Sequence, residues 1–416
     1  MALESRLAQV ASQRVKRLHI ILACDAIHRP ITGIGRYALE LARHLRNNQE
    51  IEKLAFFTYG LWQDWAALSA VEGAASAEPG RAMPRRSLRN TLAASPLVIR
   101  AYNALSPALY AYRLRGRADS LFHSPNYFLP PHPGRMVATI HDLSHVHHPE
   151  FHPQARVELL NHALPITTRR ADFLITISES VRQEIVKHFN WPADRIVSTP
   201  LGVDPSFHPR PAAELQDALR PLGLTVQGYS LFVGTVEPRK NLSALLDAYE
   251  GLPALQRSTY PLVIAGGRGW LSNDIHARMS KAASAGWLHY LSYVPQERLP
   301  ALYSGARLFV YPSLYEGFGL PLLEAMASGV PVVCSNIPSL HEVAGDAARL
   351  VDPFDVAGLQ AAISRGLEDE DWRDTAVQQG IQRAAGFTWQ RCARQTVEVY
   401  QAVTGTKTTR PAARPL

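Results

Sequence analysis

The sequence EGFGLPLLE, residues 316–324, decides the fold more directly than any other stretch of this chain. Just before it, LFVYPSLY (308–315) has the continuous apolar pattern of a buried strand that runs into a loop. Pro321 suits the first turn of a helix, because its missing N–H would find no partner there in any case. The stretch therefore predicts a strand, a loop and a helix, with Glu316 on the loop and Glu324 about one turn into the helix.

This loop suits a ligand that carries both hydroxyls and phosphate. Helix N-termini favour anions, because their first N–H groups have no partner within the helix. We expect Phe318 and Gly319 to offer N–H groups to a diphosphate there. Glu316 and Glu324 add two carboxylates that only accept hydrogen bonds. A nucleotide sugar combines these groups; the alternative is a glycine-proline turn with two solvated glutamates.

Together with AMASGVPVVCSNIPSLHEVAGDAARLVDPFD (325–355), the motif resembles the E-x7-E region of the retaining glycosyltransferases of the GT-B fold, family 4, also called glycosyl transferases group 1. The resemblance implies that Glu316 contacts the donor sugar and Glu324 the ribose of the nucleotide. It implies an α/β fold of two doubly wound, Rossmann-like parallel-sheet domains that face a central cleft. It also implies a nucleotide-sugar substrate, with no cofactor and no bound metal required for the chemistry.

The length and the strand pattern independently favour two domains. A chain of 416 residues with 46% hydrophobic residues exceeds one ordinary core. Apolar strands alternate with amphipathic helical stretches in two series, which indicates two mostly parallel sheets. The expected strands are 18–24, 54–59, 119–123, 136–140, 172–177 and 196–200, then 230–235, 261–266, 288–293, 307–312, 330–334 and 348–351.

We place one Rossmann-like domain at residues 1–205 and a second at 206–385, with the proline-rich stretch 201–211 as the linker. The resemblance assigns acceptor binding to the first domain and nucleotide-sugar binding to the second. It also predicts that a helix at 386–404 crosses back to the first domain. The polar tail 405–416 has the composition of a disordered segment. Open α/β sheets bind ligands beyond the carboxyl ends of their strands, so the reaction should take place between the domains.

Two features point to the cytoplasm. No uninterrupted apolar run approaches the roughly 18 residues that span a bilayer, and the N-terminal run, Ile20–Cys24, is too short for a signal peptide. The cysteines Cys24, Cys334 and Cys392 are far apart and form no metal or redox spacing. Cys24 and Cys334 stand in apolar strands, so we expect buried, reduced thiols there.

Residues 80–117 carry the whole excess of positive charge, since the chain has a net charge of +7 and this segment holds eight arginines and no acidic residue. They are Arg81, Arg85, Arg86, Arg89, Arg100, Arg113, Arg115 and Arg117. Arginines interleaved with leucine and tyrosine can lie on anionic lipid headgroups, so we expect peripheral contact with the cytoplasmic face of the inner membrane. A solvated helical face is the alternative. No recognition motif supports nucleic acid.

The motif GTVEPRKN (234–241) follows the apolar strand YSLFV and places two cations in a strand-to-helix loop beside the expected cleft. Arg239 and Lys240 can hold a diphosphate and stabilise the charge that builds on it as the sugar leaves. The resemblance gives this role to Lys240, together with an arginine five residues earlier. That earlier position holds Thr235 here, so we expect Arg239 to take over.

Glycines suggest two further contacts with the nucleotide sugar. In ITGIGRYALELARHL (31–45), Gly33 and Gly35 would let backbone N–H groups approach an anion closely, although a tight turn explains them equally simply. Arg36, just inside that helix, is a candidate contact to phosphate or acceptor. Gly266 follows another strand, where a base or ribose could pack against the backbone.

The histidine-rich stretch MVATIHDLSHVHHPEFHP (136–153) also places polar residues at the end of an expected strand, beside the expected cleft. His141 and Asp142 end an apolar strand, and the resemblance places His141 near donor and acceptor. Asp142 is a candidate acceptor contact, with helix capping as the alternative. His123, at the end of the preceding strand, is a third acceptor candidate, and Ser178 reads more simply as a cap. The histidine spacing matches no metal site.

The motifs predict a retaining glycosyltransferase. The EPRKN and HD variants resemble mannosyl- or rhamnosyltransferases of bacterial lipopolysaccharide and O-antigen assembly, which implies GDP-mannose or a relative as donor and a glycan, lipid-linked, as acceptor. Two alternatives remain open: a nucleotide-sugar 2-epimerase on the same fold, and a non-catalytic nucleotide-sugar-binding partner of an assembly complex. The match of 234–241 and 316–324 to transferases argues against the first. The intact Glu316, Glu324 and Lys240 argue against the second.

Overall fold

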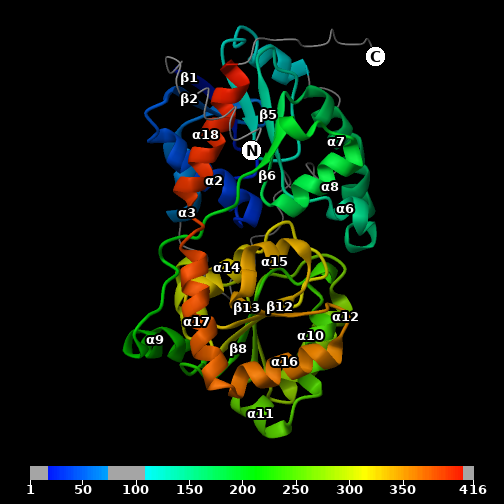
Figure 1. Ribbon diagram of the computed structural model, residues 1–416, viewed down its shortest axis with the longest axis vertical. Coiled ribbons are helices and arrows are strands. Elements are labelled where there is room, and N and C mark those ends of the chain that lie inside the picture. The colour runs from blue at the N-terminus through cyan, green and yellow to red at the C-terminus, as the bar shows by residue number, and fades with distance from the viewer. Residues whose placement is uncertain (1–16, 74–107, 406–416) are drawn as a thin grey trace, which may run out of the picture.

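Two α/β lobes stand one above the other in the computed structural model, which describes residues 17–73 and 108–405 (Figure 1). The N-terminal lobe contains a seven-stranded sheet in the order β3-β2-β1-β4-β5-β6-β7, and the C-terminal lobe a six-stranded sheet in the order β10-β9-β8-β11-β12-β13. Neighbouring strands are parallel throughout, apart from the β2–β3 pair. The strand order reverses within each sheet, so both are doubly wound, and the predicted fold class is confirmed.

The strands of the N-terminal lobe are β1 (Leu18–Ala23), β2 (Ile51–Thr58), β3 (Leu61–Gln63), β4 (Leu121–Ser124), β5 (Met136–Ile140), β6 (Phe173–Thr176) and β7 (Ile196–Ser198). Its helices are α2 (Gly33–Arg46), α3 (Trp65–Gly73), α6 (Ser144–His147), η1 (Pro149–Phe151), α7 (Gln154–Arg170), α8 (Glu179–Phe189) and η2 (Ala193–Arg195). Residues 108–113 are also helical.

The strands of the C-terminal lobe are β8 (Ser230–Val233), β9 (Leu262–Ala265), β10 (Leu288–Ser292), β11 (Leu308–Tyr311), β12 (Val332–Ser335) and β13 (Ala348–Val351). Its helices are α9 (Ala212–Leu219), η3 (Arg220–Leu222), η4 (Pro238–Lys240), α10 (Leu242–Glu250), α11 (Ala254–Thr259), α12 (Asn273–Ser284), η5 (Gln296–Arg298), α13 (Leu299–Ser304), α14 (Leu320–Ala327), α15 (Pro338–Ala344), η6 (Gly345–Ala347), α16 (Val356–Glu368) and α17 (Glu370–Ala384). The chain then enters α18 (Trp389–Gly405).

The central strands are short and apolar along their whole length because helices cover both faces of each sheet. Every residue of β4, β5, β8, β9, β11 and β12 is buried. Loops at the carboxyl ends of these strands are therefore the parts of each sheet that can hold polar groups. Those ends face the boundary between the lobes.

The chain crosses between the lobes twice, and the two crossings pair with each other. Val203 forms an isolated parallel bridge with Thr388, and its N–H donates to the carbonyl of Phe387 at 3.1 Å. The backbones approach so closely that a Cβ at Gly202 would lie 2.0 Å from the nitrogen of Trp389. After this crossing α18 runs up the N-terminal lobe and packs against α2 (Figure 1).

One strand of the described residues was not predicted. The residues LWQ form β3, which turns back antiparallel on β2 through Tyr59 and Gly60. Both turn residues have positive φ, 48° and 82°, as a two-residue type I′ hairpin requires. The hairpin extends the sheet at its edge and brings Trp62 beside Arg117, whose guanidinium carbon lies 5.3 Å from the indole ring.

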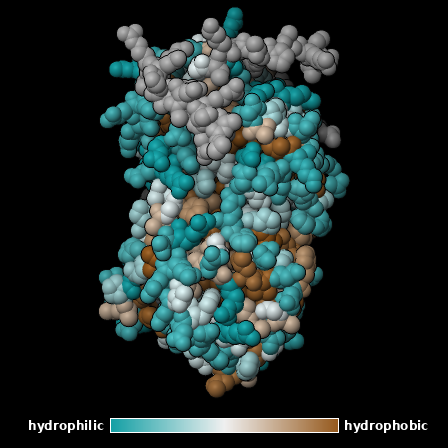
Figure 2. Space-filling view, viewed as in Figure 1, coloured by the Kyte–Doolittle hydropathy of each residue, from teal (hydrophilic) through white to brown (hydrophobic). Residues whose placement is uncertain are grey.

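The surface bears on several expectations. Hydrophilic side chains cover most of the face in Figure 2, with apolar ones emerging at the waist and on the lower lobe. No helix among the described residues is long and apolar enough to cross a membrane. The thiols of Cys24 and Cys334 are buried and unpaired, as predicted. Of the basic segment, Arg113, Arg115 and Arg117 are described and exposed; its other arginines, and the tail 406–416, lie outside the described residues.

Candidate active site

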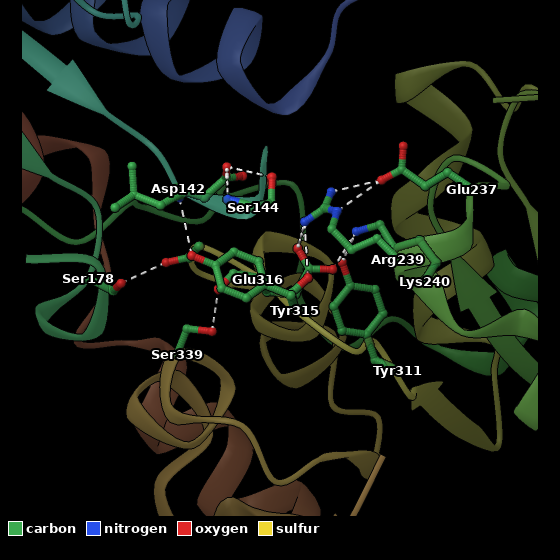
Figure 3. A network of polar contacts seen from close by, with 12 residues as sticks. Asp142, Ser144, Ser178, Glu237, Arg239, Lys240, Tyr311, Tyr315, Glu316 and Ser339 are labelled. Atoms are coloured by element: carbon green, nitrogen blue, oxygen red, sulfur yellow. Dashed lines mark hydrogen bonds and ion pairs between the residues drawn. The ribbon is translucent and has the colours of Figure 1, made fainter. Parts of the chain in front are cut away.

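Glu316, Arg239 and Lys240 meet at the carboxyl edge of the lower sheet. The two cations follow β8 and the glutamate follows β11, and these strands are neighbours. Lys240 Nζ donates to Glu316 Oε1 at 2.6 Å, and Arg239 Nη1 donates to Glu316 Oε2 at 2.8 Å (Figure 3). All three side chains are largely buried, with Glu316 8% and Lys240 7% exposed. Residues 76 positions apart thus form one charged cluster.

Two further side chains, those of Tyr311 and Glu237, hold the cations of this cluster in place. Lys240 Nζ also donates to the hydroxyl of Tyr311 at 2.6 Å, at the end of β11. Glu237 accepts from Arg239 Nε at 3.1 Å and from Nη2 at 2.9 Å. Lys240 is therefore fixed by two groups, and Arg239 by three, because its Nη1 also donates to the Tyr315 carbonyl at 3.2 Å. Each charge thus has a defined position before any substrate arrives.

Burial and pairing set the charge states in this cluster. Burial alone would raise the pKa of Glu316, but Arg239 and Lys240 outweigh it and hold that pKa below its ordinary value. Burial also opposes the charged form of Arg239, yet Glu316 and Glu237 keep its pKa well above normal. For Lys240 burial prevails and the pKa is lowered, against the attraction of Glu316. Glu316 is thus a carboxylate at neutral pH.

Glu324, the second glutamate of the motif, has a raised pKa, in contrast to the lowered pKa of Glu316. It projects from α14, whose first turn contains Pro321 as predicted. Burial raises its pKa from 4.5 to about 7, and the Tyr303 hydroxyl and the Arg36 guanidinium offset this only in part. Arg36 belongs to α2 of the upper lobe, where it also pairs with Glu72 at 2.5 Å. The lower lobe's second glutamate therefore lies within the field of an upper-lobe cation.

The upper lobe presents His141 and Asp142 to this edge. His141 donates from Nε2 to the carbonyl of Pro125 at 2.9 Å, and burial lowers its pKa, so the ring is neutral with Nδ1 as its acceptor. Asp142 accepts from the N–H and hydroxyl of Ser144 at 3.1 and 2.8 Å. Burial would raise the pKa of Asp142, but Arg239 and these hydrogen bonds lower it. Asp142 thus accepts the N–H of the first residue of α6, whose N-cap is Leu143, and its charge also attracts Arg239.

The loop that carries Glu316 also touches the upper lobe directly. A Cβ at Gly317 would lie 2.1 Å from the carbonyl oxygen of His141, so only glycine fits there. Ser178 Oγ donates to the Gly317 carbonyl at 2.7 Å (Figure 3). The same oxygen accepts from Val181 N at 3.2 Å, which caps α8. Ser178 is therefore the predicted cap, and in addition a contact between lobes.

Two more side chains connect the lobes. The Tyr315 hydroxyl donates to Glu184 Oε2 at 2.5 Å and accepts from Leu143 N at 3.2 Å. Glu342 on α15 accepts from the N–H groups of Glu179 and Ser180 at 2.8 and 3.1 Å. It thus caps helix α8 of the other lobe, where a carboxylate is favoured by the helix dipole.

The predicted glycines have distinct settings. Gly35 is packed against the chain, since a Cβ there would lie 2.6 Å from the Ala26 carbonyl, whereas a Cβ at Gly33 would meet nothing within 4 Å. At Gly266 a Cβ would lie 1.9 Å from the Gly234 carbonyl. Gly319 precedes α14 with φ of 105°. Next to it, Phe318 packs its ring against Phe387, with centroids 5.9 Å apart.

His123 lies away from this edge. It is the third residue of β4 rather than its end, and it is fully buried. Its Nδ1 lies 2.6 Å from the Tyr400 hydroxyl of α18, and its Nε2 2.9 Å from Thr139 Oγ1. The predicted contact of His123 with the acceptor is therefore wrong in this structure, where His123 makes hydrogen bonds inside the N-terminal lobe instead. In the described part of the chain no cluster of three His, Cys, Asp or Glu side chains could hold a metal ion.

The structure adds site residues that the motifs did not reveal. Tyr311 and Glu237 support the cations, and Tyr315, Ser339 and Glu342 position the loops; Ser339 Oγ donates to the Glu316 carbonyl at 2.6 Å. Tyr311, Tyr315 and Glu237 stand within or beside the quoted motifs. The partners of Tyr311 and Tyr315 stand 71 to 172 positions away, which spacing alone does not indicate. Glu237 is only two positions from Arg239, but the motif does not show that the two side chains pair.

Two facing Rossmann-like lobes, with a glutamate between two cations at their shared edge, define a glycosyltransferase of the GT-B fold. Residues 31–207 match the model of "Glycosyltransferase Family 4", and residues 224–383 that of "Glycosyl transferases group 1". The chain is 43% identical over 384 residues to the O-antigen chain mannosyltransferase B of Escherichia coli, which covers 92% of this chain and the whole of that protein. The chain belongs to glycosyltransferase family 4, and its donor substrate is a nucleotide sugar.

Solved structures agree on the fold. WaaG, a glycosyltransferase involved in lipopolysaccharide biosynthesis, superposes with a TM-score of 0.68 at 17% identity, over 93% of this chain and all of that chain. Sucrose-phosphate synthase from Thermosynechococcus elongatus gives 0.65 at 22% identity, over 94% of this chain and all of its own. At such identities these likenesses concern the architecture alone.

Proposed function

We propose that this enzyme transfers mannose from GDP-mannose, with retention of configuration, to a lipid-linked glycan in O-antigen assembly. The observation that carries the proposal is the 43% identity to the O-antigen chain mannosyltransferase B of Escherichia coli, over 92% of this chain and the whole of that protein. The serotype-specific mannosyltransferase WbdA of Escherichia coli supports it more weakly, at 33% identity over 232 residues, which are 55% of this chain and 28% of that protein.

In this proposal the charged cluster performs the transfer. Arg239 and Lys240 bind the diphosphate and stabilise the negative charge that it gains as the bond from the sugar C1 to its oxygen breaks. Their fixed positions, beside Glu316, provide this stabilisation without reorganisation. Glu316 orients the sugar as it becomes oxocarbenium-like. The acceptor oxygen bonds to C1 on the face that the diphosphate leaves, and the leaving phosphate takes the acceptor proton.

The surrounding residues bind the rest of the donor. Glu324 accepts from the ribose hydroxyls, and the N–H groups of Phe318 and Gly319 bind diphosphate oxygens at the start of α14. Gly33 does the same from the opposite lobe, where Gly35 allows the close turn and donates its own N–H to Thr32 Oγ1 at 3.3 Å. The backbone at Gly266 packs against the nucleoside. His141, Asp142 and Arg36 lie on the acceptor side of the donor. Contact between the lobes excludes water from the sugar and limits hydrolysis.

The donor is tested with a panel of GDP-, UDP-, dTDP- and ADP-sugars and the matching free nucleotides. A ligand at 100 times its dissociation constant stabilises the folded chain by about 2.7 kcal/mol, which is visible as a rise in melting temperature. We expect the rise with GDP and GDP-mannose alone. Stabilisation by another nucleotide, or by none, would overturn the proposed donor. Release of GDP from GDP-mannose in the presence of lipid extract then tests the transfer.

The described part of the basic segment supports a membrane contact. Arg113 and Arg115 are exposed next to Tyr112, which is 71% exposed, and near Leu109, which is 39% exposed. Arginine and tyrosine side chains together suit the interface of an anionic bilayer. In our proposal this face rests on the cytoplasmic surface of the inner membrane and brings the enzyme to its lipid-linked acceptor.

Liposome sedimentation tests this contact. Vesicles with anionic lipid should bind the protein at low salt and release it at high salt. R113E/R115E should weaken binding, whereas K281E/R365E, an equal charge change on the exposed surface of the lower lobe, should not. Equal binding by both variants, or none by the wild type, would overturn the membrane contact and leave the donor proposal untouched.

A further inference from the structure

The N-terminal lobe contains a cavity of about 690 Å³ at the carboxyl edge of its sheet. Its walls are the loop after β1, the end of β2, the loop between β4 and β5, and one side of α7. A volume in this range is typical of sites for small organic ligands. None of the residues predicted to bind the donor lines it.

The cavity shares a wall with the candidate active site. Pro125, whose carbonyl accepts from His141, is part of its lining, and so is Tyr127, whose ring centroid lies 6.0 Å from that of His141. On the other side Arg156 lines the cavity and stacks its guanidinium 5.4 Å from the ring of Trp270 in the lower lobe. The cavity therefore begins next to the reacting edge and reaches the boundary between the lobes.

The lining has the chemistry of a saccharide site. Most of it is apolar or aromatic, with Tyr59, Tyr110 and Phe128 among its rings, and the carboxylate of Asp25 stands among them. A pyranose has apolar C–H faces that stack on rings and hydroxyls that donate to a carboxylate. A hydrocarbon chain would instead leave the carboxylate facing apolar groups, which is costly.

Tyr59 is held in an unusual position at this cavity. It is a tyrosine with positive φ, 48°, and it remains 52% exposed. Its N–H donates to Asp25 Oδ1 at 2.6 Å, and its hydroxyl donates to the Asp25 carbonyl at 3.1 Å. Strained backbone of this kind persists where neighbours fix it, and it is common at binding sites. Asp25 thus fixes an exposed ring at the cavity.

We propose that this cavity binds a pyranose unit of the acceptor glycan, stacked on Tyr59 and hydrogen-bonded to Asp25. The inference rests on the proposed function, since it supplies the acceptor for that transfer. The acceptor chain would enter at the cavity and end at the wall that Pro125 and His141 share. Its last sugar would then face the donor sugar held by Glu316.

Tyr59→Asn tests the stacking, because asparagine tolerates the same positive φ while the ring is lost, together with the hydrogen bond from its hydroxyl to the Asp25 carbonyl. Tyr293→Asn is the matched control, since Tyr293 is also 52% exposed and lies in the lower lobe. With a lipid-linked mannosyl acceptor, we expect Y59N to raise the acceptor KM at least tenfold. The donor KM, and the melting-temperature rise with GDP-mannose, should stay unchanged. Y293N should match the wild type in every measurement.

A binding experiment separates this inference from the proposed function. Saturation-transfer NMR with methyl α-mannoside and an α-linked mannobiose, and separately with farnesyl diphosphate, uses the whole chain without turnover. Saccharide signals that are lost in Y59N and reduced in D25N support the cavity site even if GDP-mannose proves to be the wrong donor. Binding of farnesyl diphosphate alone, or saccharide signals and an acceptor KM unchanged in Y59N, would overturn it.

Discussion

Glu324→Gln should change how the stability of this enzyme depends on pH. Burial raises the pKa of Glu324 from 4.5 to about 7 in the folded chain. An acid with a higher pKa in the folded state binds more protons there than in the unfolded state, so stability falls as the pH rises between the two values. One pKa unit corresponds to 1.36 kcal/mol. Ionisation of Glu324 should therefore lower the free energy of unfolding of the wild type by about 3 kcal/mol between pH 4.5 and pH 8.

The assay is urea denaturation of wild type and E324Q across that range, followed by circular dichroism and by tryptophan fluorescence. Glutamine keeps the shape of the side chain and cannot ionise. We therefore expect the free energy of unfolding of E324Q, relative to wild type, to improve by about 3 kcal/mol as the pH rises. A difference that stays constant within about 0.5 kcal/mol, the size of an ordinary surface effect, would refute the reasoning.

Glu316→Gln provides a control of opposite sign. The pKa of Glu316 is lowered by Arg239 and Lys240, so its carboxylate stabilises the folded state above the unfolded pKa and loses this effect as the pH falls. The free energy of unfolding of E316Q, relative to that of the wild type, should therefore fall as the pH rises. Two glutamates of one nine-residue motif would then show opposite pH dependences, which a general effect of removing a carboxylate cannot produce.

Three further predictions concern the site. Lys240→Met removes the ammonium that, in our proposal, binds the diphosphate, so kcat should fall by about 10²-fold or more while exposed Lys281→Met has no effect; a K240M enzyme with nearly normal kcat would contradict this role. Glu342→Ala removes the carboxylate that caps α8 and should weaken the contact between the lobes by about 1–2 kcal/mol. The donor KM should then rise about 5- to 30-fold with a normal kcat. An unchanged KM, or the same rise in the control Glu297→Ala, would argue against this role. Asp142→Asn keeps an oxygen that accepts from Ser144 but removes the charge beside Arg239, so kcat should fall about tenfold with unchanged stabilisation by GDP; a normal kcat would exclude this role.

The strand pattern could be predicted from the sequence because buried parallel strands are continuous apolar runs between loops. Each expected strand overlaps one in the structure, within a few residues at its ends. β3 was missed because LWQ is too short to show alternation and its turn, Tyr59-Gly60, lacks the usual Asn-Gly or Asp-Gly signal. In the structure, hydrogen bonds from the N–H and the hydroxyl of Tyr59 to Asp25 hold the tyrosine in that turn.

His123 shows how a small error at a strand end changes a functional prediction. The expected strand stopped at this residue, whereas β4 continues to Ser124. Side chains alternate between the two faces of a strand. Phe122 and Ser124 therefore line the cavity, and His123 points to the opposite side, where it meets Tyr400. The strand was predictable, but the face was not, since it depends on where α18 packs.

The contacts between lobes could not be predicted for a different reason. The E-x7-E motif and the EPRKN motif belong to one lobe, so neighbouring strands bring them together whenever that sheet forms. Ser178, Tyr315 and Glu342 depend instead on how one lobe lies against the other. Nothing in the periodicity of either domain encodes that arrangement.

These contacts converge on the loop that carries Glu316. The carbonyl of Glu316 accepts from Ser339 of its own lobe, and the next carbonyl, that of Gly317, accepts from Ser178 of the other lobe. Tyr315, immediately before it, bonds to Glu184 and to Leu143 of the other lobe. Since the loop is fixed from both sides, the position of Glu316 depends on the contact between the lobes. Separation of the lobes would therefore disturb the glutamate itself, and not only admit water. In our proposal, in which Glu316 orients the donor sugar, transfer thus requires the lobes to be in contact.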